Sequence, residues 1–288
     1  MESKYDYIVI GAGSSGCVVA GRLGEAGYKV LLLEAGGKDN SPWIKIPLGY
    51  SKLYNNPKVN WCYTSEPEPE LNNRPLFQPR GKVLGGSGSI NGMIYMRGQA
   101  QDFDAWEAQG CVGWGWEEVL PYFKKSENQQ RGASEFHGVG GPLEVSDLPS
   151  NHALGEAFHS ASAALGSPRN HDFNGADQVG TGYVQINTKK QRRWSTASGF
   201  LTGPAMQNIT VQLGAMVENI ILHNGVATGV RWGNKSGKHE SFVTQEVIVC
   251  GGVFNSPQIL ELSGIGKREV LEKAGVEVQH ELPGVGEN

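Results

Sequence analysis

The chain has 288 residues, a hydrophobic fraction of 39% and a net charge of −4 from 25 basic and 29 acidic residues. This length allows one large domain or two ordinary ones. There is no basic excess to attract nucleic acid and no polybasic run to bind anionic lipid, so neither partner is expected. No apolar run reaches the ~18 residues of a membrane helix, and the N-terminus lacks the features of a signal peptide, so we predict a cytoplasmic, soluble protein.

The cysteines do not form a metal-binding pattern. Cys17, Cys62, Cys111 and Cys250 are scattered, with no C-x-x-C motif. This spacing favours free thiols in a reducing compartment, buried for Cys17 and Cys250, and predicts no metal site. Glycine supplies 41 residues, well above its usual share, which is typical of a chain with many tight turns and backbone–ligand contacts.

The first 34 residues form a complete β–α–β pattern. Residues 5–10 predict a strand, residues 17–26 a helix, and residues 29–33 a second strand that ends at Glu34. A G-x-G-x-x-G turn lies between the first strand and the helix, where it would bind a dinucleotide pyrophosphate. An ordinary α/β turn would not explain the small residues at helical spacing, which are Cys17, Ala20, Gly21 and Gly24.

Each part of this pattern has a physical role. Gly11 permits the tight turn, Gly13 lets the backbone approach a pyrophosphate, and Gly16 lets the helix lie close to the sheet. The N–H groups at the helix start favour the phosphate charge. Glu34 can accept hydrogen bonds from both ribose hydroxyls and would repel a 2′-phosphate, which argues against NADP. This unit alone does not separate FAD from NAD.

The middle of the chain contains a second glycine-rich stretch. Residues 36–75 are rich in loops and prolines, as in a functional cover. Residues 80–97 (RGKVLGGSGSINGMIYMR) offer many backbone N–H groups and little bulk, as expected where backbone wraps an extended ligand. Periodicity then predicts helices over residues 101–109, 116–125 and 151–165, a strand over 183–187, and a helix capped by Ser195 that runs through Leu201.

From Thr210 the pattern becomes hairpin-like. A strand is predicted from residue 210 through Val217, followed by residues 220–223 and an Asn224-Gly225 turn. The remaining predicted elements are strands over 226–232 and 241–250 and a helix over 256–262. The apolar run EVIVC at the end of the last strand is typical of a buried parallel sheet.

Three blocks of the chain resemble the glucose–methanol–choline (GMC) oxidoreductases, a family of FAD-dependent alcohol oxidases and dehydrogenases. They are the opening DYIVIGAGSSG…LLLEAG, residues 81–98 and residues 251–266, and they occur in the family's order. Val253 departs from the family, which usually has a small residue there, and would narrow the adenosine site. Within the family, the sequence as a whole is most similar to choline-dehydrogenase-type and medium-chain alcohol dehydrogenases.

The resemblance implies FAD as the cofactor and assigns residues to it. The complete predicted set is Gly11, Gly13, Ser14, Ser15, Gly16, Glu34, Ala35, Arg80, Val83, Gly85, Gly86, Ser89, Asn91, Gly92, Met93, Ile94, Val217, Cys250 and Gly251. Asn91 takes the place where some members have a histidine, including those with covalent flavin, so noncovalent FAD is expected. Val217 and Cys250 equally suit a sheet core, and Arg80 and Lys82 are either solvated charges or phosphate contacts.

The resemblance also implies the fold and the domains. The expected class is α/β, with a Rossmann-like FAD/NAD(P)-binding domain and part of an α+β substrate-binding domain. We expect residues 1–150 to be the first part of the FAD-binding domain, with a cover loop at about 36–75. Residues 151–205 would begin the substrate-binding domain, and residues 206–288 would continue the FAD-binding domain.

In the family, the phrase LPGVGEN at residues 282–288 continues into a long segment. That segment supplies the catalytic pair, a histidine with a second histidine or asparagine. None of the seven histidines of this chain sits in that motif, so no catalytic residue is predicted here. We expect a truncated chain that needs the C-terminal half for activity. It would fold poorly alone, because an incomplete sheet exposes apolar surface and edge groups.

The predicted function is oxidation of a small-molecule alcohol at its CH–OH group, with hydride transfer to flavin N5. One alternative is a non-catalytic FAD-binding fragment. Another is a non-redox flavin enzyme, such as a lyase or a decarboxylase. The last is a simple two-domain NAD dehydrogenase, which a flavin spectrum would exclude.

Overall fold

The computed structural model describes residues 4–149 and 151–287. The chain divides into two compact units. The first, which we call the sheet unit, holds residues 1–44, 48–90 and 195–288, and the second unit holds residues 45–47 and 91–194.

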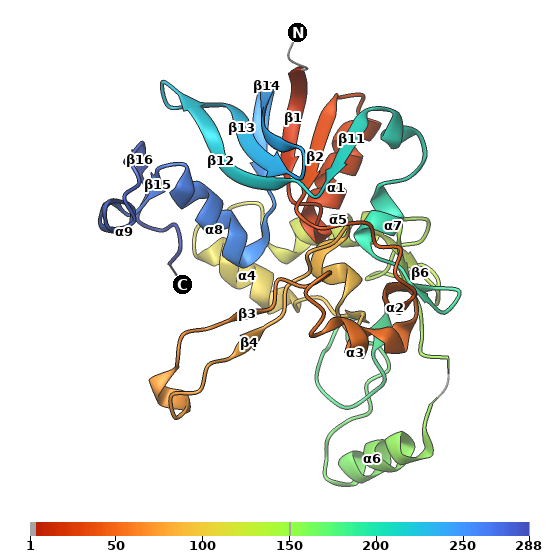
Figure 1. The fold of residues 1–288 in the computed structure, drawn as a ribbon. Coiled ribbons are helices and arrows are strands. Elements are labelled where there is room, and N and C mark those ends of the chain that lie inside the picture. Colours follow the sequence, from red (N-terminus) through yellow and green to blue (C-terminus); the bar gives the residue numbers. More distant parts are fainter. Residues whose placement is uncertain (1–3, 150, 288) are drawn as a thin grey trace. The chain divides into compact units, whose positions relative to one another are not determined.

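A six-stranded sheet organises the sheet unit (Figure 1). Its strands, in spatial order, are β11 (Ile209–Leu213), β2 (Val30–Glu34), β1 (Lys4–Ile10), β14 (Gly237–Val249), β13 (Val226–Asn234) and β12 (Met216–His223). The first four strands run parallel, and β14, β13 and β12 pair antiparallel. The predicted parallel environment of the EVIVC run is therefore confirmed.

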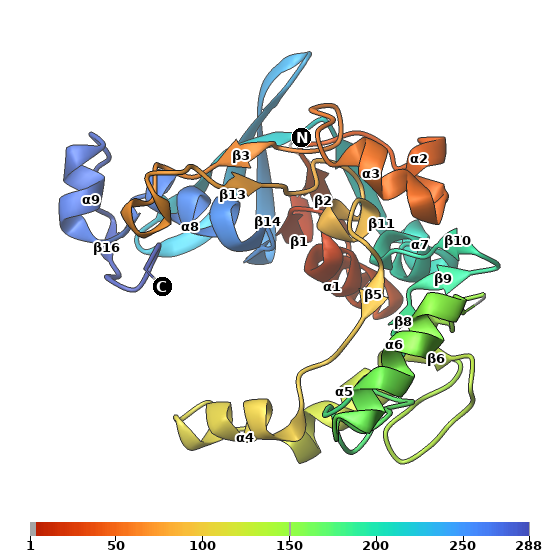
Figure 2. The same cartoon turned by 90° about the horizontal axis from the view of Figure 1, so that it is seen from below.

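One face of the parallel strands is covered by helix α1 (Ser14–Glu25). Val9, Val30 and Leu32 point to this face and pack with Ala20 of the helix. Helix α7 (Thr196–Phe200) and the 3-10 helix η4 (Gly203–Gln207) lie beside α1 (Figure 2). The small residues of α1 make this close packing possible, because a Cβ on Gly21 would lie 2.6 Å from the carbonyl oxygen of Phe200.

The opposite face carries a second core. Ile8, Ile10, Leu31 and Leu33 alternate with the residues above and point to this side, as strand geometry requires. They share the core with Val217, Ile220, Val230 and Trp232 of the hairpin and with Ile259 of helix α8 (Gly252–Leu262). Both faces of the parallel strands are therefore buried, which explains their continuous apolar sequences.

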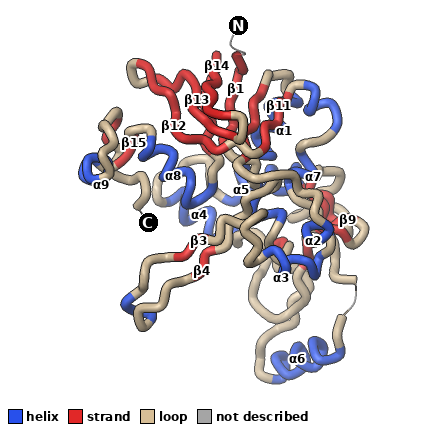
Figure 3. The backbone as a smooth tube through the Cα atoms, viewed as in Figure 1, coloured by secondary structure: helices blue, strands red, loops and turns tan. Residues whose placement is uncertain are grey.

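The stretch between β2 and residue 90 is mostly loop (Figure 3). Ile44, Leu53, Val59, Val83 and Ile90 form a third core that fixes it. Its short elements are α2 (Pro42–Lys45), η1 (Pro47–Gly49), α3 (Tyr50–Leu53), β3 (Tyr63–Thr64), η2 (Pro69–Leu71), β4 (Phe77–Gln78) and η3 (Gly86–Ser89). The C-terminal elements of the sheet unit are β15 (Ile265–Gly266), α9 (Arg268–Lys273) and β16 (His280–Glu281).

In its described residues, the second unit combines three helices with short strand pairs. Its helices are α4 (Ala100–Ala108), α5 (Trp116–Ser126) and α6 (Ala153–Ala164), close to their predicted ranges. Pro121 lies inside α5 without ending it. The strand pairs are β5 (Ile94–Tyr95) with β8 (Gln185–Ile186), β6 (Glu127–Gln129) with β7 (Leu143–Val145), and β9 (Thr188–Lys189) with β10 (Arg192–Arg193).

The structure corrects three predicted elements. The strand predicted from residue 210 through Val217 is two strands, because the chain leaves β2 after Leu213 and Val217 pairs with Trp232 instead. The strand predicted over 183–187 is only the two residues of β8, and the helix predicted from residue 256 begins at Gly252. Ser195 caps α7 as predicted, with its side chain accepting from the N–H of Ser198.

The predicted fold class is confirmed: the chain is α/β, with a Rossmann-like parallel core. The boundaries of the compact units differ from the predicted domains, since residues 91–150 group with 151–194. The roles of the units in cofactor and substrate binding stay a prediction. Among the described residues, no helix has both the length and the apolar character needed to cross a bilayer.

Candidate functional site

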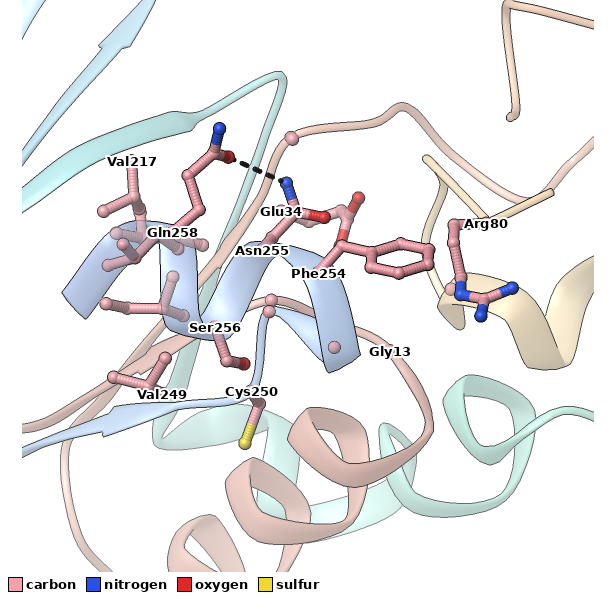
Figure 4. Close-up of a pocket in the computed structure, with 18 of the residues that line it drawn as sticks. Gly13, Glu34, Arg80, Val217, Val249, Cys250, Phe254, Asn255, Ser256 and Gln258 are labelled. Atoms are coloured by element: carbon pink, nitrogen blue, oxygen red, sulfur yellow. Dashed lines mark hydrogen bonds between the residues drawn. The ribbon is translucent and has the colours of Figure 1, made fainter. Parts of the chain in front are cut away.

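A cavity of about 440 Å³ lies within the sheet unit (Figure 4). It is lined by the carboxyl ends of β1, β2 and β14, by the start of α1, and by the first turns of α8. In an open α/β sheet this edge is where ligands bind, because the loops that follow the parallel strands meet there. The sequence placed its G-x-G-x-x-G turn at the same edge.

The first wall of the cavity is the turn between β1 and α1. Gly11 has φ +95°, and a Cβ there would lie 2.4 Å from the carbonyl oxygen of Cys250, so no other residue fits. No side chain of the described residues caps the start of α1. Its first N–H groups and its dipole therefore face the cavity as a site for negative charge.

The second glycine loop lies directly against this turn. The N–H of Gly85 donates a 2.7 Å hydrogen bond to the carbonyl oxygen of Ala12. A Cβ on Gly86 would lie only 2.6 Å from the Cα of Gly13, and Gly86 has φ +55°. Gly86 and Ser87 line the cavity together with Gly13. The structure thus places side by side the two glycine segments, some seventy residues apart in the sequence, whose residues the family resemblance assigned to one cofactor.

Glu34 closes the cavity at the end of β2. Its side chain is buried and accepts hydrogen bonds from the N–H of Ala12 at 2.9 Å and from the N–H of Gly36 at 2.8 Å. Burial raises the pKa of this carboxyl, and the two N–H donors oppose that change. Each oxygen can accept a further hydrogen bond, so the carboxylate still fits a diol at the cavity wall.

Aromatic side chains form the outer rim. The guanidinium of Arg80 lies 4.7 Å from the centre of the Phe254 ring, and Figure 4 shows the two facing each other. Trp61 stacks on Tyr63 with ring centres 5.6 Å apart, and the Tyr63 hydroxyl accepts a 2.8 Å hydrogen bond from Asn255. These contacts join the loop-rich stretch to α8. A flat ligand group at this rim would meet aromatic faces and the guanidinium of Arg80.

The last wall comes from the end of β14 and the start of α8. Val217, Cys250 and Gly251 line the cavity, as does Val253, which is 64% exposed. Burial raises the pKa of the Cys250 thiol, which keeps it protonated near neutral pH. The Cys250 thiol is therefore no nucleophile near neutral pH, and the polar side chains of Asn255, Ser256 and Gln258 on α8 line the cavity beside it.

The structure brings together most of the predicted cofactor residues of the sheet unit. Those that line the cavity are Gly11, Gly13, Ser14, Ser15, Glu34, Ala35, Arg80, Gly86, Val217, Cys250 and Gly251. Those of the sheet unit that do not line it are Gly16, Val83, Gly85 and Ser89. Gly16 instead lets α1 pack on the carbonyl of Gly11, and the Ser89 hydroxyl donates to the carbonyl of Leu84 at 2.7 Å. Asn91, Gly92, Met93 and Ile94 belong to the second unit.

Sequence reasoning missed the α8 and rim residues of the cavity. Trp61 lies in the loop-rich stretch and was not assigned to the cofactor, and Phe254, Asn255 and Gln258 carried no signal beyond their place in the third family block. None of the seven histidines lines the cavity. In the part of the chain that the structure describes, no group of three His, Cys, Asp or Glu side chains is arranged to hold a metal ion.

Comparison with known proteins identifies the family. The model of the GMC oxidoreductases matches residues 5–288. The chain belongs to the GMC oxidoreductase family. It is 43% identical to an oxygen-dependent choline dehydrogenase of Photobacterium profundum, over 100% of this chain and 51% of that protein. It is 42% identical to an alcohol dehydrogenase [acceptor] of Pseudomonas putida, over 99% of this chain and 52% of that protein.

The fold of this GMC chain is shared with solved structures. One is an FAD-dependent oxidoreductase from Chaetomium thermophilum, with a TM-score of 0.91 and 28% sequence identity, covering 98% of this chain and 51% of that one. The chain spans about half the length of the curated relatives it matches. The sequence-based recognition of the family is confirmed.

Proposed function

We propose that this chain binds FAD noncovalently and forms the dinucleotide-binding part of an oxidoreductase that acts on CH–OH groups. The observation that carries the proposal is the contact between the two glycine segments at one cavity, with the Ala12 carbonyl bound to the Gly85 N–H and Glu34 at the wall. A dinucleotide needs these features together: a close backbone approach for the pyrophosphate, a helix start for its charge, and a carboxylate for the ribose.

The residues of the cavity fit the adenosine and pyrophosphate of FAD. Gly13, Ser15 and Gly86 would hold the pyrophosphate, and Glu34 would hold the ribose. The protonated thiol of Cys250 and the apolar Val217 suit the adenosine side. Bound flavin would supply the hydride acceptor for the alcohol. The chain's own residues position that cofactor and exclude a second negative charge beside Glu34.

Choline and other small primary alcohols are the proposed donor class, because the relatives are named choline dehydrogenase and alcohol dehydrogenase. Turnover is proposed for a protein of the relatives' length, since the family's catalytic pair is not matched in this sequence. FAD binding is proposed for this chain itself. A non-catalytic FAD-binding chain is the second candidate, and the cavity supports both equally.

The deciding experiment is an absorption spectrum of the purified chain with and without added FAD. We expect a protein-bound flavin band near one equivalent of FAD, released intact by denaturation, and no comparable binding of NAD. Release of free FAD separates noncovalent from covalent attachment. A chain that is folded by circular dichroism and binds neither FAD nor its ADP half would refute the proposal. Bleaching of the flavin by an alcohol would separate the catalytic from the non-catalytic candidate.

A further inference from the structure

The outer rim of the cavity is built from two segments that are far apart in the sequence. Trp61 and Arg80 belong to the loop-rich stretch, whereas Phe254 and Asn255 belong to the first turns of α8 (Figure 4). Among the described residues, no main-chain hydrogen bond joins residues 60–82, which we call the arm, to α8. Side-chain contacts therefore hold this part of the cavity wall together.

Tyr63 makes the contact that joins the arm to α8. Its hydroxyl accepts a 2.8 Å hydrogen bond from Nδ2 of Asn255. Its ring meets the Phe254 ring edge to face, with ring centres 5.7 Å apart, and stacks on Trp61. Tyr63 itself does not line the cavity. Its contacts thus hold the lining residues Phe254 and Asn255 against the arm from behind the wall.

The base of the arm is fixed independently of this contact. Asn60 is 1% exposed, and its Oδ1 accepts the N–H groups of Cys62 and Arg80 at 2.9 Å each. The N–H of Trp61 donates to the carbonyl oxygen of Arg80 at 2.8 Å. Cys62 has φ +54°, and a residue with a Cβ keeps this conformation only where its surroundings fix the backbone. The chain therefore leaves a fixed base directly before Tyr63.

Separating Tyr63 from Asn255 leaves every helix and strand intact. It breaks one neutral hydrogen bond, whose loss shifts an equilibrium by only about two- to tenfold. Residues 66–70 and 72–77 of the arm are exposed, so few packed contacts resist its movement. The wall can therefore open at low cost by movement of the arm on its fixed base.

We infer that the hydrogen bond between Tyr63 and Asn255 is a gate to the dinucleotide cavity. While the bond is made, the wall is closed; when it breaks, a dinucleotide can enter or leave past the arm. This inference rests on the proposed function. Tyr63 is a positioning residue, because it acts through Asn255 and Phe254 and does not itself line the cavity. A gate slows entry and release together.

The test compares Tyr63→Phe with Tyr54→Phe in the purified chain with FAD. Phenylalanine keeps the ring contacts of Tyr63 and removes only the hydroxyl. Tyr54 is the matched control: it lies in the same stretch, its ring packs on Phe77, and its hydroxyl has no hydrogen bond among the described residues. Stopped-flow flavin fluorescence measures the association and dissociation rates of FAD. Both rates should rise about two- to tenfold in Tyr63→Phe, and neither should change in Tyr54→Phe.

The rise of both rates separates a gate from a merely structural contact. Loss of structural support would weaken FAD binding without making entry faster, whereas an opened gate changes the Kd less than it changes either rate. If Tyr63→Phe binds and releases FAD at the wild-type rates, the gate is wrong and the proposed function stands. Faster release with unchanged entry would overturn the gate as well.

Hydrogen exchange gives a readout that does not need the cofactor. Without FAD, the amides of Thr64 and Ser65 should exchange faster in Tyr63→Phe than in the wild type or in the control variant. The amide of Lys82, which donates to the carbonyl oxygen of Val59 at 2.8 Å in the fixed base, should not change. If the wild type binds no FAD, the proposed function fails, and equal exchange in all three proteins would then reject the gate.

Asn255→Ala removes the same hydrogen bond from the side of α8 and covers the case in which Tyr63→Phe does not fold. It should also raise both rates. Where both variants fold, the double variant should release FAD no faster than the faster single variant, because each substitution removes the same bond. Multiplied effects on the release rate, or wild-type rates in Asn255→Ala, would overturn the inference.

Discussion

One oxygen of Glu34 accepts the backbone N–H of Ala12 at 2.9 Å, so the carboxylate that ends β2 also fixes the glycine turn that follows β1. Its other oxygen accepts the N–H of Gly36 at 2.8 Å. The residue assigned to the ribose is therefore also part of the frame of the cavity. Changes at Glu34 should affect stability as well as binding.

The substitution Glu34→Gln should lower both the stability of the chain and its affinity for FAD. Glutamine has one acceptor oxygen and an NH₂ group, so one of the two buried N–H donors loses its partner at a cost of about 1–3 kcal/mol. FAD affinity should fall as well, because the ribose would face a donor. Unfolding by denaturant and FAD titration measure the two effects. Glu25→Gln is the control, since Glu25 is exposed and its ion pair with Arg22 is worth only about 0.5 kcal/mol. Equal stability of the two variants would contradict the framing role.

Gly86→Ala should separate the two glycine segments. Its Cβ would lie 2.6 Å from the Cα of Gly13, and backbone on both sides leaves nothing free to move away. We expect the FAD affinity to fall by more than about tenfold. The free energy of unfolding should also fall by about 1–2 kcal/mol, because a residue with a Cβ is unfavourable at positive φ. Gly203→Ala is a matched control, because Gly203 has φ +61° and open space around its Cβ position. Gly203→Ala should lose stability but keep its FAD affinity. A larger loss of FAD affinity in Gly203→Ala than in Gly86→Ala would contradict the close approach of Gly86 to Gly13.

The stability of the chain should fall as pH rises above neutrality. His137 is buried between Glu127, with 3.1 Å contacts, and Asp172, at 2.8 Å, and hydrogen bonds to these carboxylates raise its pKa to about 9. A raised pKa means that this stabilisation is complete below the unfolded value of about 6.5 and is lost as pH rises through about 9. At 1.36 kcal/mol per pH unit the loss is at most about 3 kcal/mol.

Apparent unfolding temperatures between pH 6 and pH 10 check this prediction. His137→Gln should remove most of the slope over that range, whereas His223→Gln should not, because His223 is exposed at the end of β12. If the unfolding temperature of His137→Gln still falls with pH as it does in the wild type, the pH dependence belongs to another group.

The thiols should react very unequally. Burial raises the pKa of the Cys17 thiol to about 12, so almost no thiolate forms at pH 8, whereas Cys111 is exposed. Alkylation of the native chain followed by mass spectrometry should label Cys111 first and leave Cys17 unlabelled until the chain is unfolded. Early labelling of Cys17 would mean that α1 opens readily from the sheet.

The purified chain should not behave as a stable monomer. Helix α6 exposes Leu154 and Phe158, at 74% and 62%, and Leu165 beside it is 89% exposed. Apolar side chains gathered on one short helix favour association. We expect sedimentation that depends on protein concentration and a broad thermal unfolding transition. In a Phe158→Ser variant the association should be weaker and the transition narrower. Thr244→Ser, at an exposed position of β14, serves as the control. A cooperative melt of a monomeric wild type would refute the prediction.

The sequence alone determined the features that depend on neighbouring residues. The β–α–β unit, the turn at Gly11 and the cap at Ser195 all follow from spacing and local backbone chemistry, and the structure has each of them. The resemblance to the GMC family assigned both glycine segments to one cofactor, and the structure brings them into contact through the Gly85 N–H and the Ala12 carbonyl. The three stretches that resemble the GMC family, in the family's order, identified the cofactor class that the local pattern alone left open.

Only the tertiary structure decided the features that join distant parts of the chain. No local pattern indicates that Phe254 faces Arg80, that Glu34 holds the N–H of Ala12, or that the chain crosses between sheet partners after Leu213. Arg193 and Asn91 are 102 residues apart, and each alone is an ordinary polar residue. Such contacts depend on how packed elements meet, which periodicity within a window cannot encode. Local backbone chemistry therefore determined the glycine turn at the start of α1, and long-range packing determined which residues surround it.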